Sequence, residues 1–334
     1  MTRIQNEEPI PAEYVQRLLR GSAPERLDDI KALWNKYQPQ FCMADDGPGA
    51  LLSTNKERVV FDLKTMAVYW QLSFAGWKVL GCYSPAVYAS LPAGNLSNLL
   101  GLPADLMRHS FPPGTTIEHV LEADRGLADA EARFQESVYV ARSILHADGM
   151  DETDWPADIP RPEAEREMFT DIEDTAAFDI AVISTAYAFC HELRHLMFAR
   201  DQDTPLSRPD EELACDTWAR QFLTENYAAY AKAQSVAADS VLAKRSIGGA
   251  IGIFVLYETT ERIGDAGSEN YPPLADRMNA TLADTPLDRD HKFWTTYACV
   301  LVAILRRRNV RIDVRAQDAK NLCELLVEKI RATS

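Results

Sequence analysis

The stretch from Asp171 to Arg200 constrains the fold more than any other feature, because it contains neither proline nor glycine. These two residue types break or weaken helices, so their absence over this length predicts one long α-helix. After Pro162 nearly every other segment also has helical character. The expected helices are about 171–199, 209–232, 237–263, 272–283, 290–308 and 316–332. We therefore expect the second half of the chain to be a helical bundle.

The first half of the chain has a mixed character. Apolar residues lie among charges over 11–37, which predicts two short surface helices. Two apolar clusters flank a polar turn between Leu51 and Phe61, a pattern typical of a β-hairpin. Helical spacing predicts a largely buried helix over 66–80 and an amphipathic helix over 129–146. The expected fold class is α+β, predominantly α-helical, with a small N-terminal sheet.

Two proline-containing segments suggest how the chain is divided. They are Pro-Pro-Gly at 112–114 and the proline- and aspartate-rich run from Asp148 to Pro162, and both should interrupt regular structure. The second predicts a boundary between a mixed N-terminal lobe, residues 1–162, and a helical lobe, residues 163–334. A single continuous domain of 334 residues is the alternative.

Composition and charge exclude several classes of function. The chain has 50 acidic and 35 basic residues and a formal net charge of −15, which opposes binding to nucleic acid. Its N-terminus is polar and acidic, unlike a secretory signal. The most apolar stretch, from Ile247 to Tyr257, is too short to cross a bilayer and is expected to be a buried helix. The six cysteines are widely spaced, without a C-x-x-C pair, and are expected to be free thiols, mostly in the core. We expect a cytoplasmic protein that binds neither nucleic acid nor membranes.

The long predicted helix contains an H-E-x-x-H motif formed by His191, Glu192 and His195. Residues four apart lie on one face of a helix, so both imidazoles can bind one Zn²⁺, and Glu192 can reach a water on that metal. The alternative interpretation is two solvated histidines on an amphipathic helix. The residues that follow along the chain favour the metal site.

A second predicted helix supplies a third ligand. Ser207, followed by Pro209 and Asp210, is typical of a helix start. Glu212 in this helix would complete a His₂Glu set, which leaves the fourth position of a catalytic zinc open for water. Asp216 lies one turn further on, where its carboxylate could accept the second N–H of a ligating histidine.

This pattern resembles that of the gluzincin zinc metallopeptidases, in which H-E-x-x-H is followed by E-x-x-x-D on a later helix. The resemblance implies a zincin-like fold with the active-site helix in the helical lobe. It also implies a role for each matching residue: His191, His195 and Glu212 as zinc ligands, Glu192 as general base and Asp216 as the residue that orients a ligand.

A narrower resemblance is to the Lit-type phage-exclusion peptidases, which are cytoplasmic zinc proteases. The run from Glu211 to Ala219, E-E-L-A-C-D-T-W-A, is similar to the helix that follows H-E-x-x-H in that family. The family cleaves translation elongation factor Tu. The resemblance therefore implies a phage-exclusion or stress protease whose protein substrate is that factor.

The segment from Tyr271 to Arg277 resembles the His-Pro-…-Arg segment that opens a late helix in several helical gluzincins. Tyr271 stands at the histidine position and could donate a hydrogen bond to a developing oxyanion. The alternative is a proline-initiated helix with Arg277 in a surface ion pair. His291 is a second candidate donor, although an isolated histidine at a helix start is more often a surface or capping residue. The remaining histidines are assigned to structure: His109, His119 and His146.

Cys190 and Cys215 are neighbours in sequence of candidate ligands. Cys190 should point about 100° away from the face that carries His191. Cys215 adjoins Asp216 and is not on the stripe of Glu212. Both are therefore expected in the core and not on a metal.

Two hypotheses of function remain. The first is a zinc-dependent endopeptidase in which metal-activated water attacks the peptide bond. Its substrate would add to the edge of a small sheet, so that Glu57 to Phe61, or a strand paired with it, borders the zinc cleft. The second is a non-catalytic regulatory or interaction protein in which a metal only staples two helices together.

Overall fold

The computed structural model describes residues 7–45, 49–55, 57–111, 114–147, 154–162, 165–259 and 266–333. Several sequence predictions fall on residues outside these ranges. They concern the N-terminal residues up to Asn6, the turn residue Lys56, the prolines at 112 and 113, the first part of the 148–162 run, and the end of the helix expected to reach Ile263.

A small mixed sheet of four strands forms the N-terminal part, in the order β1-β2-β4-β3. Its outer pairs are antiparallel, whereas β2 and β4 run parallel. The predicted hairpin is confirmed as β3 paired with β4, and β3 is an edge strand. The strands are β1 (Glu7–Ile10), β2 (Gln40–Ala44), β3 (Leu52–Thr54) and β4 (Arg58–Phe61).

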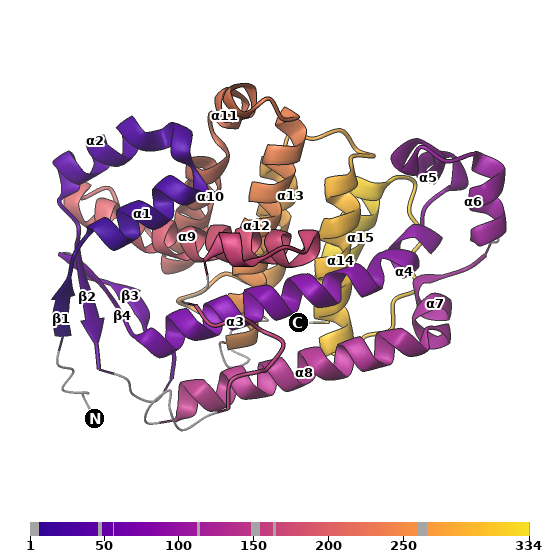
Figure 1. Cartoon of the computed structure of the whole chain (residues 1–334), viewed down its shortest axis with the longest axis horizontal. Helices are drawn as coiled ribbons and strands as arrows, with labels where there is room; N and C mark the ends of the chain where they lie inside the picture. Colours follow the sequence, from indigo (N-terminus) through magenta and orange to yellow (C-terminus); the bar gives the residue numbers. More distant parts are fainter. Residues whose placement is uncertain are drawn as a thin grey trace.

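Two helices, α1 (Glu13–Ser22) and α2 (Leu27–Tyr37), connect β1 to β2, as the sequence predicted. Each buries one face, with Leu19 and Ile30 almost fully enclosed. A short 3₁₀ turn, η1 (Pro24–Arg26), joins them. The sheet, α1 and α2 lie at one end of the molecule, and α5 and α6 lie at the opposite end (Figure 1).

The other regular elements of the described chain are helices, which confirms an α+β fold that is predominantly α-helical. Short 3₁₀ turns occur at η2 (Gly81–Tyr83) and η4 (Arg166–Met168). The α-helices are α3 (Leu63–Leu80), α4 (Ser84–Ala89), α5 (Ala93–Leu100), α6 (Ala104–Ser110), α7 (Ile117–Ala123), α8 (Arg125–His146), α9 (Ile172–Asp201), α10 (Arg208–Thr224), α11 (Tyr227–Gln234), α12 (Ala238–Thr259), α13 (Leu274–Asp284), α14 (Lys292–Arg307) and α15 (Ala319–Ala332).

The long helix α9 packs against α3, α10 and α12. Glycines of α12 allow this helix to lie close to α9. A Cβ at Gly252 would lie 2.9 Å from the ring of Tyr187 on α9, which is too close for a side chain. Most of the buried apolar side chains form one large cluster that extends from Val15 to Ile330, and a few on β2 and β4 form a small second cluster. It includes side chains from both predicted lobes, and the lobe boundary itself stays a prediction.

Two predictions about helices were incomplete. The segment 209–232 is not one helix, because Glu225 is extended and Asn226 has a positive φ of 63°, which ends α10 and starts α11. The four short helices α4 to α7 were not predicted. They have six to eight residues each, too few for a helical apolar period to be distinguished.

Helix α12 is the one helix of the described residues that is long and apolar enough to cross a membrane. Of its most apolar window, 78% is buried inside the protein, as in the core helix of a globular fold. The predicted buried helix over 247–257 is thus confirmed for most of its length.

Candidate metal centre

The centre forms where α9 and α10 pack against each other. Asp171 caps the start of α9, and Gln202, with a positive φ of 59°, ends it. The chain then reverses, and the Ser207 side chain accepts a hydrogen bond from the Asp210 backbone N–H to start α10, as the sequence predicted. This reversal brings the acidic face of α10 against the two histidines of α9.

The two imidazoles and one carboxylate converge at the centre. Nε2 of His191 lies 3.2 Å from Nε2 of His195. Oε2 of Glu212 lies 3.1 Å from Nε2 of His191, and its Oε1 lies 3.4 Å from Nε2 of His195. Three atoms of the types that bind transition metals therefore face a common point.

Asp216 holds His191 from behind. Its Oδ1 lies 2.9 Å from Nδ1 of His191 and also accepts a hydrogen bond of 2.6 Å from the hydroxyl of Tyr187. An ionised carboxylate can only accept, so Nδ1 of His191 carries a proton and Nε2 is left to bind a metal. Asp216 is fully buried, as expected of a residue that orients a ligand.

Arg277 of α13 closes this buried side of the centre. Its Nε donates to Oδ2 of Asp216 at 2.6 Å, and its Nη2 lies 3.4 Å from Oε2 of Glu212. The residue is only 6% exposed. The alternative prediction of a surface ion pair for Arg277 is therefore wrong. Sequence could not place it, because 61 residues separate it from Asp216.

A second carboxylate, Glu211, holds His195 on the other side. Its Oε1 lies 2.7 Å from Nδ1 of His195, and its Oε2 accepts a hydrogen bond of 2.6 Å from Arg208. The sequence pattern had predicted no role for Glu211. The signal was present in the Glu211-Glu212 pair, since adjacent helical residues point about 100° apart and can reach two different imidazoles.

The charges of the centre alter one another's pKa. Burial alone would lower the pKa of His191, but the carboxylates of Asp216 and Glu212 outweigh it and raise the pKa to about 10. The pKa of His195 is also raised, because Glu212 outweighs burial. Burial opposes ionisation of Glu212 and Asp216, yet the adjacent histidines and Arg277 hold both pKa values well below the usual range. The two carboxylates therefore favour the protonated form of the His191 imidazole.

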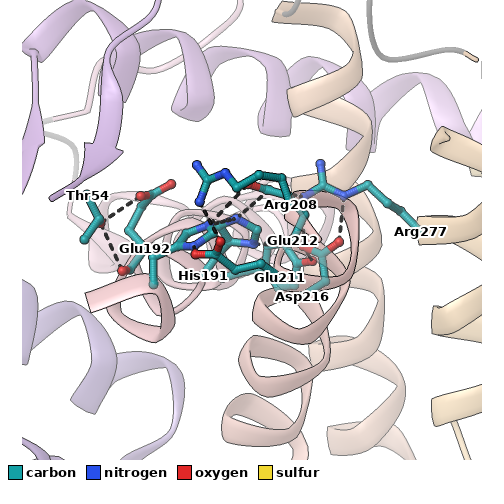
Figure 2. Close-up of polar contacts among 10 residues, drawn as sticks. Thr54, His191, Glu192, Arg208, Glu211, Glu212, Asp216 and Arg277 are labelled. Atoms are coloured by element: carbon teal, nitrogen blue, oxygen red, sulfur yellow. Dashed lines mark hydrogen bonds and ion pairs between the residues drawn. The ribbon is translucent and has the colours of Figure 1, made fainter. Parts of the chain in front are cut away.

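Glu192 points to the side of the imidazoles away from Arg277, toward strand β3 (Figure 2). The Thr54 hydroxyl lies 2.8 Å from its Oε2 and 3.0 Å from its backbone carbonyl oxygen. Burial raises the pKa of this carboxyl group above the ordinary value. A carboxylate of raised pKa beside a metal-binding face is suited to accept a proton.

These groups border a cavity of about 330 Å³. Strand β3 forms one wall and the start of α10 another. The lining residues are Leu52, Ser53, Thr54, Asn55, Glu192, His195, Ala199, Thr204, Arg208, Glu211, Glu212 and Tyr271.

The sequence predicted that Glu57 to Phe61, or a strand paired with it, borders the zinc cleft. The strand that borders the cavity is β3, which pairs with β4. Because β4 pairs with both β2 and β3, Val59 lies in an interior strand.

Cys215 lies nearer the centre than the sequence suggested. One ligand atom from each of His191, His195 and Cys215 lies within 4.8 Å of the other two, so this group could hold a metal ion. The expectation that Cys215 lies in the core is confirmed, because the residue is fully enclosed. Residues three apart on a helix share a face, and Cys215 is three residues after Glu212.

Tyr271 is half-exposed at the rim of the cavity. No described contact fixes its hydroxyl, and its role as an oxyanion donor stays a prediction. His291 caps the start of α14 through a hydrogen bond from the Phe293 backbone N–H, which confirms the capping alternative. The other three histidines are exposed and do not line the cavity: His109, His119 and His146.

The cysteines agree with the sequence prediction. All six are free, and five of them are buried, Cys82 being the partly exposed one. Cys190 is fully enclosed on the core side of α9.

Comparisons with known proteins identify a family for this chain. No curated protein and no solved structure matches it. The family model described as peptidase U49 matches residues 114–297, a range that contains the two histidines, their carboxylate partners and Arg277. Because this match covers more than half of the 334 residues, the chain belongs to the peptidase U49 family.

Proposed function

We propose that this protein is a zinc-dependent endopeptidase whose catalytic centre is formed by His191, His195, Glu212 and Glu192. The observation that carries the proposal is the convergence of two imidazole Nε2 atoms and the Glu212 carboxylate beside Glu192, in a chain that belongs to a peptidase family. A peptide bond needs both an activated water and a proton for the leaving amine, and this arrangement has groups for each.

The chemistry of the donor atoms fits zinc. Two imidazole nitrogens and one carboxylate are a standard set for catalytic zinc, and the Nδ1 atoms of both histidines are held by carboxylates, which leaves Nε2 as the binding atom. When bound, zinc would act as a Lewis acid toward the scissile carbonyl and lower the pKa of water. His191, His195 and Glu212 would hold it.

Glu192 acts as the general base in this proposal. Its Oε2 accepts a hydrogen bond from Thr54, whereas none of the described residues donates a hydrogen bond to its Oε1. That oxygen is available to take a proton from the attacking water. Glu192 then returns the proton to the amine nitrogen as the peptide bond breaks.

The substrate would be an extended segment of a protein chain that adds to β3. The hydrogen bonds from Asp62 N to Leu51 O and from Asn55 N to Arg58 O show that residues 51 and 55 face β4. Backbone groups alternate along a strand, so those of Leu52 and Thr54 face the free edge beside the cavity. Main-chain pairing at such an edge binds extended peptides.

Metal analysis and one variant test the proposal. Purified protein should contain about one zinc per chain and cleave fluorescein-labelled casein. Glu192→Gln should retain the metal and lose hydrolysis, and His191→Ala should lose both. Hydrolysis by Glu192→Gln at the wild-type rate would exclude the assigned base.

The family resemblance supports a narrower version of the proposal. The Lit-type phage-exclusion peptidases belong to the same family, and we propose elongation factor Tu as the substrate, cleaved in the cytoplasm during phage infection. Incubation of the purified protein with elongation factor Tu should give two defined fragments, which Glu192→Gln does not produce. Cleavage of casein without cleavage of elongation factor Tu would support the peptidase and reject this substrate.

One observation favours a second function, that of a non-catalytic protein in which a metal only joins α9 to α10. If Cys215 bound the metal together with His191, His195 and Glu212, the four protein ligands would close the site. Burial and the adjacent Glu212 and Asp216 carboxylates raise the pKa of the Cys215 thiol, which disfavours the thiolate that a metal needs. Cys215→Ser should therefore retain metal and hydrolysis. Loss of metal with this variant would support the staple.

A further inference from the structure

We infer that Thr54 is a positioning residue, which fixes the carboxylate of Glu192 and joins it to the edge strand on which the substrate lies. This inference rests on the proposed function, because it assigns Thr54 to the reaction for which Glu192 is the base. Thr54 belongs to β3, and it is part of neither the H-E-x-x-H motif nor the helix that carries Glu211 and Glu212.

The contacts of Glu192 carry the inference. Within the described part of the chain, Thr54 is the one residue whose side chain hydrogen-bonds the Glu192 carboxylate, at 2.8 Å. Every other carboxylate of the centre is held by an arginine or a histidine. A glutamate side chain rotates about three bonds, so this single contact decides where its proton-accepting oxygen lies.

Thr54 also anchors the strand to the helix. The same hydroxyl lies 3.0 Å from the backbone carbonyl oxygen of Glu192, so it contacts the residue at both its main chain and its carboxylate. One hydroxyl proton is shared between these two acceptors, and each contact depends on how β3 lies against α9.

The backbone polar groups of Thr54 point in a different direction from its side chain. Its N–H and C=O point to the free edge of β3, where the substrate main chain would pair, while its side chain points to Glu192. A displacement of β3 therefore moves the bound peptide and the base together. This coupling keeps the distance between the base and the scissile bond constant, and small errors in that distance reduce rates strongly.

The rival explanation is a purely structural role, in which Thr54 only holds the hairpin against α9. Both explanations predict some loss of stability on removal of the hydroxyl. They differ in kinetics, because a structural anchor supports binding and folding, whereas a positioning residue acts on the chemical step through Glu192.

The test uses the full-length, zinc-loaded protein with fluorescein-labelled casein as the probe. Thr54→Val keeps the shape of the side chain and removes the hydroxyl. It should lower kcat by about 10–100-fold with little change of KM, and Thr54→Ser should restore kcat to within about threefold of wild type.

Thr65→Val is the matched control. The Thr65 hydroxyl accepts a hydrogen bond of 2.7 Å from the Leu51 backbone N–H, so it supports the same hairpin without touching Glu192. This variant should lower the melting temperature and leave kcat unchanged. If Thr54→Val and Thr65→Val reduce kcat equally, or if Thr54→Ser is as slow as Thr54→Val, Thr54 is only structural.

A crystal structure of Thr54→Val separates this inference from the proposed function. The Glu192 carboxylate should leave its position or occupy more than one, while His191, His195 and Glu212 stay in place. An unchanged Glu192 in the variant overturns the inference even if wild-type protein cleaves casein. Lack of wild-type hydrolysis, with Glu192 displaced in the variant, would reject the peptidase and retain the contact.

Discussion

His191 and His195 come from the same helix, but their carboxylate partners lie in different surroundings. Asp216, which holds His191, is fully buried and accepts hydrogen bonds from Tyr187 and Arg277. Glu211, which holds His195, is also buried, but it is paired with Arg208, whose side chain is 58% exposed. One imidazole is thus fixed from the core and the other from the solvent side of the cavity.

This difference indicates which half of the centre is rigid. A buried ion pair is costly to break, because removal of one partner leaves the other charge without compensation. An exposed arginine contributes little to the orientation of its partner, since water screens the pair. We therefore expect changes around His191 to reduce metal affinity and stability strongly. Changes around His195 should reduce metal affinity only slightly.

The largest effect is expected from Asp216→Asn. It weakens the hold on Nδ1 of His191 and leaves the Arg277 guanidinium buried without its main partner. Metal affinity should fall by about 10–100-fold, and the free energy of unfolding should fall by about 3–5 kcal/mol. Competition with a chromophoric chelator and urea unfolding measure the two quantities.

Asp179→Asn is a control for the loss of a carboxylate. Asp179 lies on the same helix α9 and is paired with Arg166 and Lys244, away from the imidazoles. It should reduce stability slightly and leave metal affinity unchanged. Equal losses of metal affinity in both variants would mean that the Asp216 effect is general destabilisation.

Metal affinity should also depend on pH. In the metal-free protein the pKa of His191 is raised to about 10, so its imidazole is protonated at neutral pH, and a metal must displace this proton. Affinity should therefore rise with pH between 7 and 9, by about tenfold per unit for each proton displaced. Chelator competition at several pH values measures the slope, and a flat profile would contradict the assignment of His191 as a ligand.

Glu211→Gln is expected to have a smaller effect than Asp216→Asn. The amide can still accept a hydrogen bond from Nδ1 of His195, and no buried arginine loses its partner. Metal affinity should fall by about tenfold or less, at the low end for changes that reach a metal only through its ligand. A loss as large as that of Asp216→Asn would show that the two sides of the centre are equally rigid.

The smallest effect is expected from Arg208→Ala. Its guanidinium is exposed, so it should change metal affinity by less than about threefold. The effect should diminish at high salt, which screens exposed charges. Isothermal titration with zinc at two salt concentrations tests this, and a large effect independent of salt would make Arg208 part of the rigid side.

Local sequence patterns predicted most of the elements that position the centre. Three elements depend on local signals: the helix that carries His191, the start of the helix that carries Glu212 and the hairpin near Thr54. The signals are a lack of helix breakers, a capping serine and two apolar clusters around a polar turn. The strands β1 and β2 escaped prediction because α1 and α2 separate them along the chain, so no hairpin pattern marks their pairing. The turn at Asn226 escaped prediction because neither proline nor glycine interrupts the sequence there.

The sequence by itself determined which side chains of α9 share a face, because helical spacing alone brings His191 and His195 together. It also determined that a glutamate of the next helix could approach them. Which carboxylate meets which imidazole depends on the rotation and crossing of α9 and α10, and these follow from packing along the whole contact. Tertiary structure alone therefore placed Glu211 on His195, buried Arg277 against Asp216, and brought Thr54, 138 residues away, to Glu192.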